Sequence, residues 1–333
     1  MAYIDARDAR GEWQPDELPK PGPLFNLPIE PRKILKFLIS LVWPINFLYA
    51  ALAFISWQYL TPSMERMSTL SFDWIALIYL RNAGWLVLLA GIMHLRLFIQ
   101  KSQGIRYKYT DKWLASNDKK FLFGNQTWDN VFWSLTSGCM VWTGYEAITL
   151  WAYANNLLPY LDIGSRPVLG LLMAIGIVLF RQVHFYWTHR FTHWKPLYKA
   201  AHYLHHKNVN IGPWSGISMH PIEHLLYFSG VFLHWVVGSH PLLMMFHMYH
   251  SALNPIRGHS GFDRFIISGA DSEKERLMEA GSYYHYLHHR FFTVNFGNEG
   301  IPLDKWFGSF HDGSEEAQAA MLARRNRKRN KGT

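Results

Sequence analysis

The segment VLGLLMAIGIVLFRQVHFYWTHRFTH, residues 168–193, joins two kinds of sequence. Its first part, Val168 to Trp187, is mostly apolar and has the roughly 20 residues that an α-helix needs to cross a bilayer. Its last part carries His189 and His193, and side chains four positions apart lie on one face of a helix. The segment therefore predicts a membrane helix that ends in a pair of histidines.

Histidine is concentrated in the second half of the chain, where seventeen of the 18 histidines lie from His184 onward. Two further groups share the spacing HxxHH: His202, His205 and His206, and then His285, His288 and His289. On a helix, each group can direct two or three imidazoles at one point. Eight clustered histidines exceed the three or four ligands of a zinc ion, so we expect two metal ions near each other. No ExxH pair occurs, so the ligands should be mostly histidine.

The isolated histidines carry a weaker signal, because a single histidine in an apolar stretch is usually a buried core or interface residue. This interpretation applies to His94, His234, His240 and His247. His184 lies five residues before His189, off the face that His189 shares with His193. It would be a ligand only if an HxxxxH pair were used.

Three more apolar segments precede residue 168, at about 34–60, 74–98 and 131–157. Together with Val168 to Trp187 they predict about four membrane spans, and Trp and Tyr at their ends disfavour a soluble protein. Basic residues gather before the first segment and after the second and fourth. The positive-inside rule then predicts that both termini and every histidine group lie on the cytoplasmic side.

Residues 222–253 are apolar but are interrupted by Gly238, His240 and Pro241. They fit two half-length pieces that enter the membrane and return, or lie at its interface. Charges from Asp271 to Glu279 predict a solvent-exposed helix. The expected fold is all-α, with a multi-pass membrane helical domain and a cytosolic histidine-rich helical cap. Its expected parts are a polar N-terminal arm (1–31), a transmembrane region (32–187), a catalytic cap with an interfacial hairpin (188–313) and a basic C-terminal tail (314–333).

Two charges, Arg81 and Glu146, interrupt the second and third apolar segments at similar depth. Lone charges at that depth are costly, so we predict that they form a structural pair. The net charge of +9 is spread over loops and the tail, which fits a surface beside anionic lipid and not a nucleic-acid-binding domain. The single cysteine, Cys139, excludes a disulfide framework and a thiolate metal cluster. Residues 1–31 have no apolar h-region, so no cleavable signal peptide is expected.

The motifs HRFTH (189–193), HYLHH (202–206) and HYLHH (285–289) resemble the three histidine boxes of the membrane fatty acid hydroxylase and sterol desaturase superfamily. Further elements in the same order also resemble the family: MHPIE (219–223), GHSGFD (258–263) and NFGNEGIPLDKWFGSFHDG (295–313). The resemblance covers about residues 179–313. It implies a helical membrane domain whose cap holds two Fe ions, and O2-dependent hydroxylation or desaturation of a lipid.

Residue by residue, the resemblance implies ten iron ligands. These are His189, His193, His202, His205, His206, His220, His259, His285, His288 and His289. The residues expected to support these imidazoles from behind are His184, His224, His250, Glu223, Asp263 and Asp304. The chain departs from the family where many relatives carry an acid about seven positions before the first HR pair, because Arg181 and Gln182 stand here. Phe296 replaces a commoner Tyr.

Two other functions stay open. A membrane zinc-dependent hydrolase usually has a catalytic Glu within its motif, as in HExxH, and these motifs lack it. A metal transporter would place ionisable residues along its spans, which carry few here.

The expected partners are a lipid substrate, the surrounding membrane lipids and a separate electron donor that is cytochrome b5-like or ferredoxin-like. The donor should be separate because no haem-binding domain, CxxC pair or flavin fingerprint is present. The substrate stays open between a sterol-like ring, a fatty acyl chain and a lipid head group. The ending RNKGT lacks a dilysine retrieval signal, which slightly favours a bacterial inner membrane over the endoplasmic reticulum.

Overall fold

The computed structural model describes residues 7–24, 28–267 and 276–330. The fold is mostly helical, as the sequence predicts, and it also contains a two-stranded antiparallel sheet of β1 (Arg264–Ile266) and β2 (Leu277–Glu279). The expectation of a helix up to Glu279 is therefore wrong at its end. Residues 271–275, which form the rest of that expected helix, lie outside the described part of the chain.

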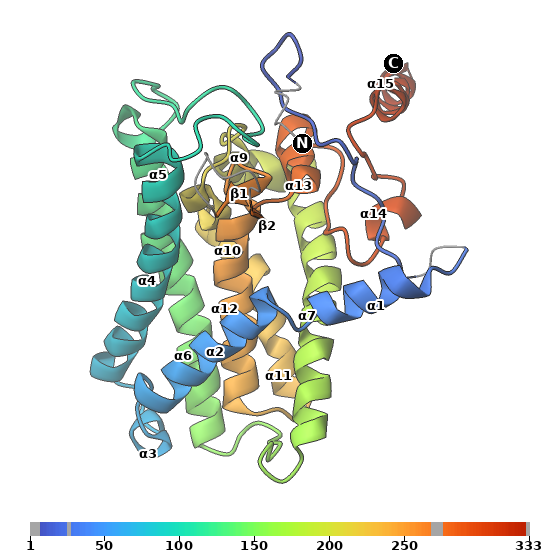
Figure 1. Cartoon of the computed structure of the whole chain (residues 1–333). Helices are drawn as coiled ribbons and strands as arrows, with labels where there is room; N and C mark the ends of the chain where they lie inside the picture. Colours follow the sequence, from blue (N-terminus) through green and yellow to red (C-terminus); the bar gives the residue numbers. More distant parts are fainter. Residues whose placement is uncertain (1–6, 25–27, 268–275, 331–333) are drawn as a thin grey trace.

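Long helices packed side by side form the body of the molecule (Figure 1). They are α4 (Phe72–His94), α6 (Cys139–Ala154), α7 (Pro167–Thr192) and α12 (Pro241–Gly258). Most side chains of α12 are buried, whereas α4 and α7 expose Leu, Ile and Val side chains on their outer faces. An outer surface this apolar suits hydrocarbon and not water.

Three helical segments are long and apolar enough to cross a membrane within the described residues: Pro31–Tyr59, Phe72–Ile99 and Pro167–Thr192. The expected span at 131–157 is largely helical, because α5 (Gln126–Trp133) continues through the π-helical turn Ser134–Gly138 into α6, but it is not among these three.

The first expected span is not one straight helix. It is divided into α1 (Pro31–Ser40) and α2 (Ile45–Tyr59), and Pro44 directly precedes α2. Figure 1 shows that both helices run across the direction of α7. The apolar pattern alone does not reveal this break, because residues on both sides of it are apolar.

The interrupted apolar region forms a helical hairpin. One arm consists of α10 (Pro221–Phe228), the 3-10 turn Ser229–Phe232 and α11 (Leu233–Val236), and α12 is the other arm. Pro221 and Pro241 are the first residues of α10 and α12, a position where the missing N–H of proline costs no helical hydrogen bond. At the turn between the arms, Ser239 N–H donates to the carbonyl of Pro159 at 3.1 Å. The hairpin therefore extends to the loop that precedes α7.

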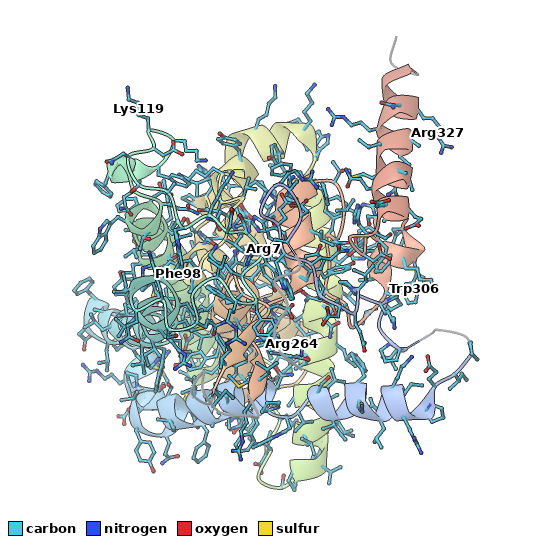
Figure 2. The ribbon with its side chains drawn as sticks, turned by 45° about the horizontal axis from the view of Figure 1, so that its top comes forward. Arg7, Phe98, Lys119, Arg264, Trp306 and Arg327 are labelled. Atoms are coloured by element: carbon cyan, nitrogen blue, oxygen red, sulfur yellow. The ribbon has the colours of Figure 1, made fainter. Side chains whose placement is uncertain are left out.

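The remaining short helices gather mainly at the other end of the bundle, around the C-terminal end of α7 (Figure 1). They are α8 (Lys195–Leu197), α9 (Tyr203–His206), α13 (Tyr283–Phe291) and α14 (Leu303–Trp306). Helix α3 (Met64–Met67) lies at the opposite end. Helix α15 (Glu315–Asn330), which carries Arg327, stands apart from the bundle (Figure 2).

A buried ion pair between Arg81 and Glu146 connects α4 to α6. Asn82 donates from Nδ2 to Glu146 Oε2 at 2.9 Å, and Arg81 donates from Nη1 to Thr61 Oγ1 at 2.8 Å. Each charge therefore has several partners inside the bundle, as a charge in an apolar interior requires.

Candidate metal centre

The histidines of the three sequence motifs reach one place from three short stretches of helix, and His259 joins them from the end of α12. His189 lies in the last turn of α7, and His193 is the residue that ends this helix. A π-helical turn, Tyr198–His202, leads directly into α9. Helix α13 begins after Ser282, whose hydroxyl accepts a hydrogen bond from the His285 N–H at 3.2 Å, as an N-cap does. These helix ends meet at the top of the bundle in Figure 1.

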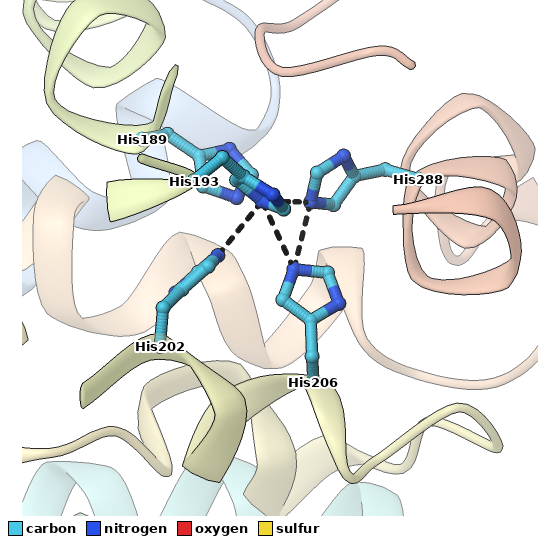
Figure 3. Close-up of side chains that lie close together, drawn as sticks. All are labelled: His189, His193, His202, His206 and His288. Carbon is cyan, nitrogen blue, oxygen red and sulfur yellow. Dashed lines mark hydrogen bonds between the residues drawn. The ribbon is translucent and has the colours of Figure 1, made fainter. Parts of the chain in front are cut away.

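Five histidines form a first group, in which the ring nitrogens converge (Figure 3). The Nε2 atom of His193 lies 2.9 Å from that of His202 and 3.2 Å from that of His206. The Nε2 atoms of His206 and His288 are 3.0 Å apart. The ring of His189 lies 4.3 Å from the ring of His288, measured between centroids. One nitrogen from each of the five lies within 4.8 Å of the others.

A second group contains four buried histidines, His205, His259, His285 and His289. The Nε2 atoms of His285 and His259 are 2.8 Å apart, and one nitrogen from each ring lies within 4.8 Å of the others. The two groups are neighbours, because the rings of His206 and His289 are separated by 4.8 Å between centroids.

The sequence pattern suggests that each HxxHH motif points at one place, but the structure divides each motif between the two groups. His205 belongs to the four-histidine group and His206 to the five-histidine group. In the same way, His289 and His288 belong to different groups. The reason is geometric, because adjacent residues of an α-helix point about 100° apart. The adjacent pairs His205–His206 and His288–His289 therefore connect the two groups into one centre.

The outward nitrogens of two rings fix their tautomers. His189 donates from Nδ1 to the carbonyl of Phe296 at 2.7 Å, and His288 donates from Nδ1 to the carbonyl of Val294 at 2.6 Å. A carbonyl can only accept, so Nδ1 carries the proton in both rings. In the neutral ring the inward Nε2 atom then has a free lone pair.

Two side chains hold the Nδ1 nitrogens of two other rings. Glu223 Oε1 lies 2.7 Å from His202 Nδ1. Ser215 Oγ lies 2.9 Å from His259 Nδ1, and this hydroxyl donates to the Gly212 carbonyl, so it accepts from the histidine. Ligand histidines of metal sites commonly show this arrangement of outer partners.

The donor set of the first group fits a metal ion. Lone pairs on nitrogens about 3 Å apart repel each other, and a cation between them removes this repulsion. Burial lowers the pKa of His202 to about 3 and that of His205 to about 4. The rings are therefore neutral at pH 7, which is the form in which imidazole binds a metal. A histidine cluster of this kind suits Zn, Cu, Fe or Ni.

One implied ligand, His220, lies in neither group. It is the N-cap of α10, and its Nδ1 accepts from the Ile222 N–H at 3.3 Å. Proline at the next position, Pro221, starts the helix there and leaves His220 to satisfy a free backbone N–H. The expectation that His220 binds metal is therefore not met by this geometry.

Of the three acids expected to hold outer nitrogens, only Glu223 contacts a histidine of either group. Asp304 accepts hydrogen bonds from the Tyr284 hydroxyl at 2.7 Å and from the Phe296 N–H at 2.9 Å. It thus shapes the loop whose carbonyl holds His189. Asp263 is bonded to Arg264 and to Tyr109, which lies 3.5 Å away.

The three histidines expected behind the centre lie in the bundle. His184 Nε2 is 3.0 Å from Ser229 Oγ, and His224 Nε2 is 3.0 Å from the Ile217 carbonyl. His250 packs edge-on against the ring of Tyr49, with 5.7 Å between centroids. None of the three has a contact with the two histidine groups among the described residues.

A cavity of about 1020 Å³ adjoins the centre. Its wall includes three rings of the second group, His205, His259 and His285, but only His189 of the first group. From there it passes Phe185 and extends between α7 and α1. Any molecule in this cavity therefore meets mainly the four-histidine group.

Sequence reasoning missed several parts of this site. The carbonyls of Phe296, Val294 and Ser218 hold ring nitrogens, but a backbone carbonyl leaves no signature in a sequence. Ser215 is one of many serines, and only the fold brings it to His259. The His-Pro pair at residues 220–221 did carry a usable signal, since this pair is typical of a helix start.

Comparison with known proteins finds a family match for this region. Residues 174–309, which include both histidine groups, match the profile described as fatty acid hydroxylase. The region is thus similar to proteins of the fatty acid hydroxylase and sterol desaturase superfamily. The match agrees with the resemblance seen in the histidine motifs.

Three curated relatives illustrate the similarity. Delta(7)-sterol 5(6)-desaturase ERG3B of Gibberella zeae is 31% identical over 140 residues, which is 41% of this chain and 42% of the relative. Delta(7)-sterol 5(6)-desaturase erg3C of Aspergillus fumigatus is 30% identical, over 42% of this chain and 48% of the relative. Methylsterol monooxygenase 1 of Gallus gallus is 28% identical, over 42% of this chain and 46% of the relative. The chain thus matches less than half the length of each relative. No solved structure matches the chain.

Proposed function

We propose that the chain is a membrane oxidoreductase that uses two iron ions, O2 and an external electron donor to hydroxylate or desaturate a lipid. The observation that carries the proposal is the pair of neighbouring histidine groups beside a large cavity. The relatives support it, since two of them are sterol desaturases and one is a methylsterol monooxygenase.

The nine histidines of the two groups are the residues that would hold the metal. A bound iron pair supplies the reduction of O2 with electrons from the donor and the oxidation of an unactivated C–H bond. For a hydroxylation, one oxygen atom of O2 enters the lipid as an alcohol, and the other leaves as water after uptake of two electrons and two protons. For a desaturation, the lipid loses two hydrogen atoms, and both oxygen atoms leave as water after uptake of two electrons from the donor and two protons.

The protein contributes orientation and exclusion of water. Glu223, Ser215 and the backbone carbonyls fix five of the nine rings, so that the lone pairs of these rings face inward. Burial keeps the rings neutral and separates the centre from bulk water. The cavity offers a lipid a path to the four-histidine group.

We infer that the electron donor is a separate protein, either cytochrome b5-like or ferredoxin-like. We also propose that both termini and the metal centre face the cytoplasm. The relatives named above come from eukaryotes, which favours the endoplasmic reticulum over the bacterial inner membrane suggested by the C-terminal ending. The lipid class stays open at this level between sterol-like, fatty acyl and head-group substrates.

A comparison of lipids from expressing cells tests the proposal. Cells that express the chain should contain a lipid with one added oxygen atom or two fewer hydrogen atoms. Cells that express His205→Ala at the same level should lack this product. Identical lipids in both cultures, together with purified protein that holds zinc and consumes no O2, would instead favour a zinc-dependent hydrolase.

A further inference from the structure

Two arginines are buried among the long helices, and they differ in their partners. Arg81 forms an ion pair with Glu146. Arg181, on α7, is 4% exposed and forms no ion pair with any residue in the described part of the chain. An unpaired charge in a membrane interior is costly and commonly marks a functional site.

The contacts of Arg181 hold the side chain in place without neutralising it. Its Nε donates to Ser251 Oγ at 3.2 Å, and its Nη2 donates to the Tyr227 hydroxyl. The Tyr227 hydroxyl in turn donates a hydrogen bond to the Ser251 carbonyl at 2.7 Å. Nη1 of Arg181 has no hydrogen-bond partner among the described residues, and the side chain lines the large cavity.

Arg181 lies on the same wall of the cavity as the metal centre. Arg181, Phe185 and His189 follow one another at four-residue spacing on α7, so they share a helix face. The Arg181 guanidinium lies 5.7 Å from the Phe185 ring centroid, and that ring stacks on His189 at 4.9 Å. Eight residues of helix rise by about 12 Å, which sets the distance along α7 from the charge to the centre.

The surroundings of Arg181 add positive charge. Arg257 also lines the cavity, and its Nε is buried without a hydrogen-bond partner among the described residues. Glu223 lines the same wall, but one of its oxygens is occupied by His202, and it forms no ion pair with either arginine. Other acids line the cavity, and Glu299 among them acts electrostatically on Arg257, but none forms an ion pair with Arg181 in the described part of the chain.

We propose that Arg181 is the binding site for an oxyanion at one end of the lipid substrate. The oxyanion, a carboxylate or a phosphate, accepts hydrogen bonds from the guanidinium, and Arg257 adds attraction. The apolar body of the lipid then extends past Phe185 and brings a carbon near the four-histidine group. Binding of the acid at Arg181 does not require metal. The inference therefore rests on the proposed function only where it says that the bound lipid is oxidised.

Binding to the purified full-length chain in detergent tests the inference. The probes are radiolabelled palmitic acid, its neutral amide hexadecanamide, and lysophosphatidic acid with the same acyl chain. The proteins are wild type, Arg181→Gln, Arg181→Lys and Arg66→Gln, the last of which alters an exposed arginine in α3. Each is measured before and after treatment with a chelator.

We expect Arg181→Gln to weaken binding of the preferred acid by about 10- to 100-fold, as for loss of a charged hydrogen bond, and to leave hexadecanamide unchanged. Arg181→Lys should lose less, and Arg66→Gln should match wild type. Preference between palmitic acid and lysophosphatidic acid identifies the oxyanion as carboxylate or phosphate.

Two results would overturn the inference. One is equal weakening of the acids and the amide in Arg181→Gln, which would assign Arg181 a purely structural role. The other is unchanged acid binding in this variant. Selective acid binding by a chain that holds no iron would leave the inference standing while the proposed oxidation failed.

Discussion

The nine histidines of the two groups, called here the cap histidines, and the histidines of the helical bundle are buried to a similar degree. Their ring nitrogens, however, face different partners. In the bundle, His234 and His247 are hydrogen-bonded to each other at 3.1 Å, and His234 also bonds the Ser239 hydroxyl. In the cap, the Nδ1 atoms of His189 and His288 donate outward, and their Nε2 atoms are left among other nitrogens. Burial alone therefore does not distinguish a metal ligand from a structural histidine. The direction of the lone pair does.

We expect the largest effect of a substitution at the ion pair of the bundle. Glu146→Gln leaves Arg81 buried without its counter-charge, which should lower the free energy of unfolding by about 3–5 kcal/mol. The metal content of the folded protein should not change, because the pair lies in the bundle. Thermal unfolding and metal analysis of the same sample measure both quantities.

Asp73→Asn is the matched control for this change. Asp73 pairs with Arg66 on the surface, where both side chains are more than half exposed. Loss of this exposed pair should lower the free energy of unfolding far less than Glu146→Gln, because water solvates both charges. Equal costs in the two variants would show that the Arg81–Glu146 pair does not hold the bundle.

The next effect concerns the support of a cap histidine. Glu223→Ala removes the acceptor of the His202 Nδ1 proton, so the ring can turn and change tautomer. We expect the affinity for metal to fall by about 10- to 100-fold. Competition titration against a metal-binding dye gives this number.

Glu223→Gln should fall between wild type and Glu223→Ala, since the amide oxygen can still accept the proton. An affinity that is the same in all three proteins would mean that Glu223 does not orient His202.

The smallest effect should come from a bundle histidine. His247→Gln removes its hydrogen bond with His234, at a cost of about 1 kcal/mol in stability. The number of metal ions per chain should equal that of wild type. Loss of an ion in this variant would show that a bundle histidine also holds metal.

Part of the fold could be predicted from the sequence for a clear physical reason. The segments that became α4 and α7 are long and mostly apolar, so length and composition decide them. The first span was predicted as one helix, because hydropathy does not register the break between α1 and α2. The β1–β2 pair was missed because three-residue strands leave little periodicity in a sequence.

The candidate site shows the same division. Helical spacing predicted that the clustered histidines lie close together, and the family resemblance added His259. Helical spacing sets His205 and His206 about 100° apart, but it could not predict which group each ring joins, since this depends on the orientation of α9. His220 was drawn into the ligand set by its motif, although its position before proline makes it a helix cap. Another His-Pro pair behaves alike, because His240 caps α12 through the Leu242 N–H at 3.0 Å.

The most direct measurement counts metal in the purified, detergent-solubilised protein from iron-replete cells. Wild type is compared with His206→Ala from the five-histidine group, His285→Ala from the four-histidine group and His247→Gln from the bundle. The account predicts two iron ions per chain in wild type and His247→Gln, and a loss of about one ion in each of the other two variants. A single zinc ion in wild type, no metal at all, or the same content in all four proteins would contradict it.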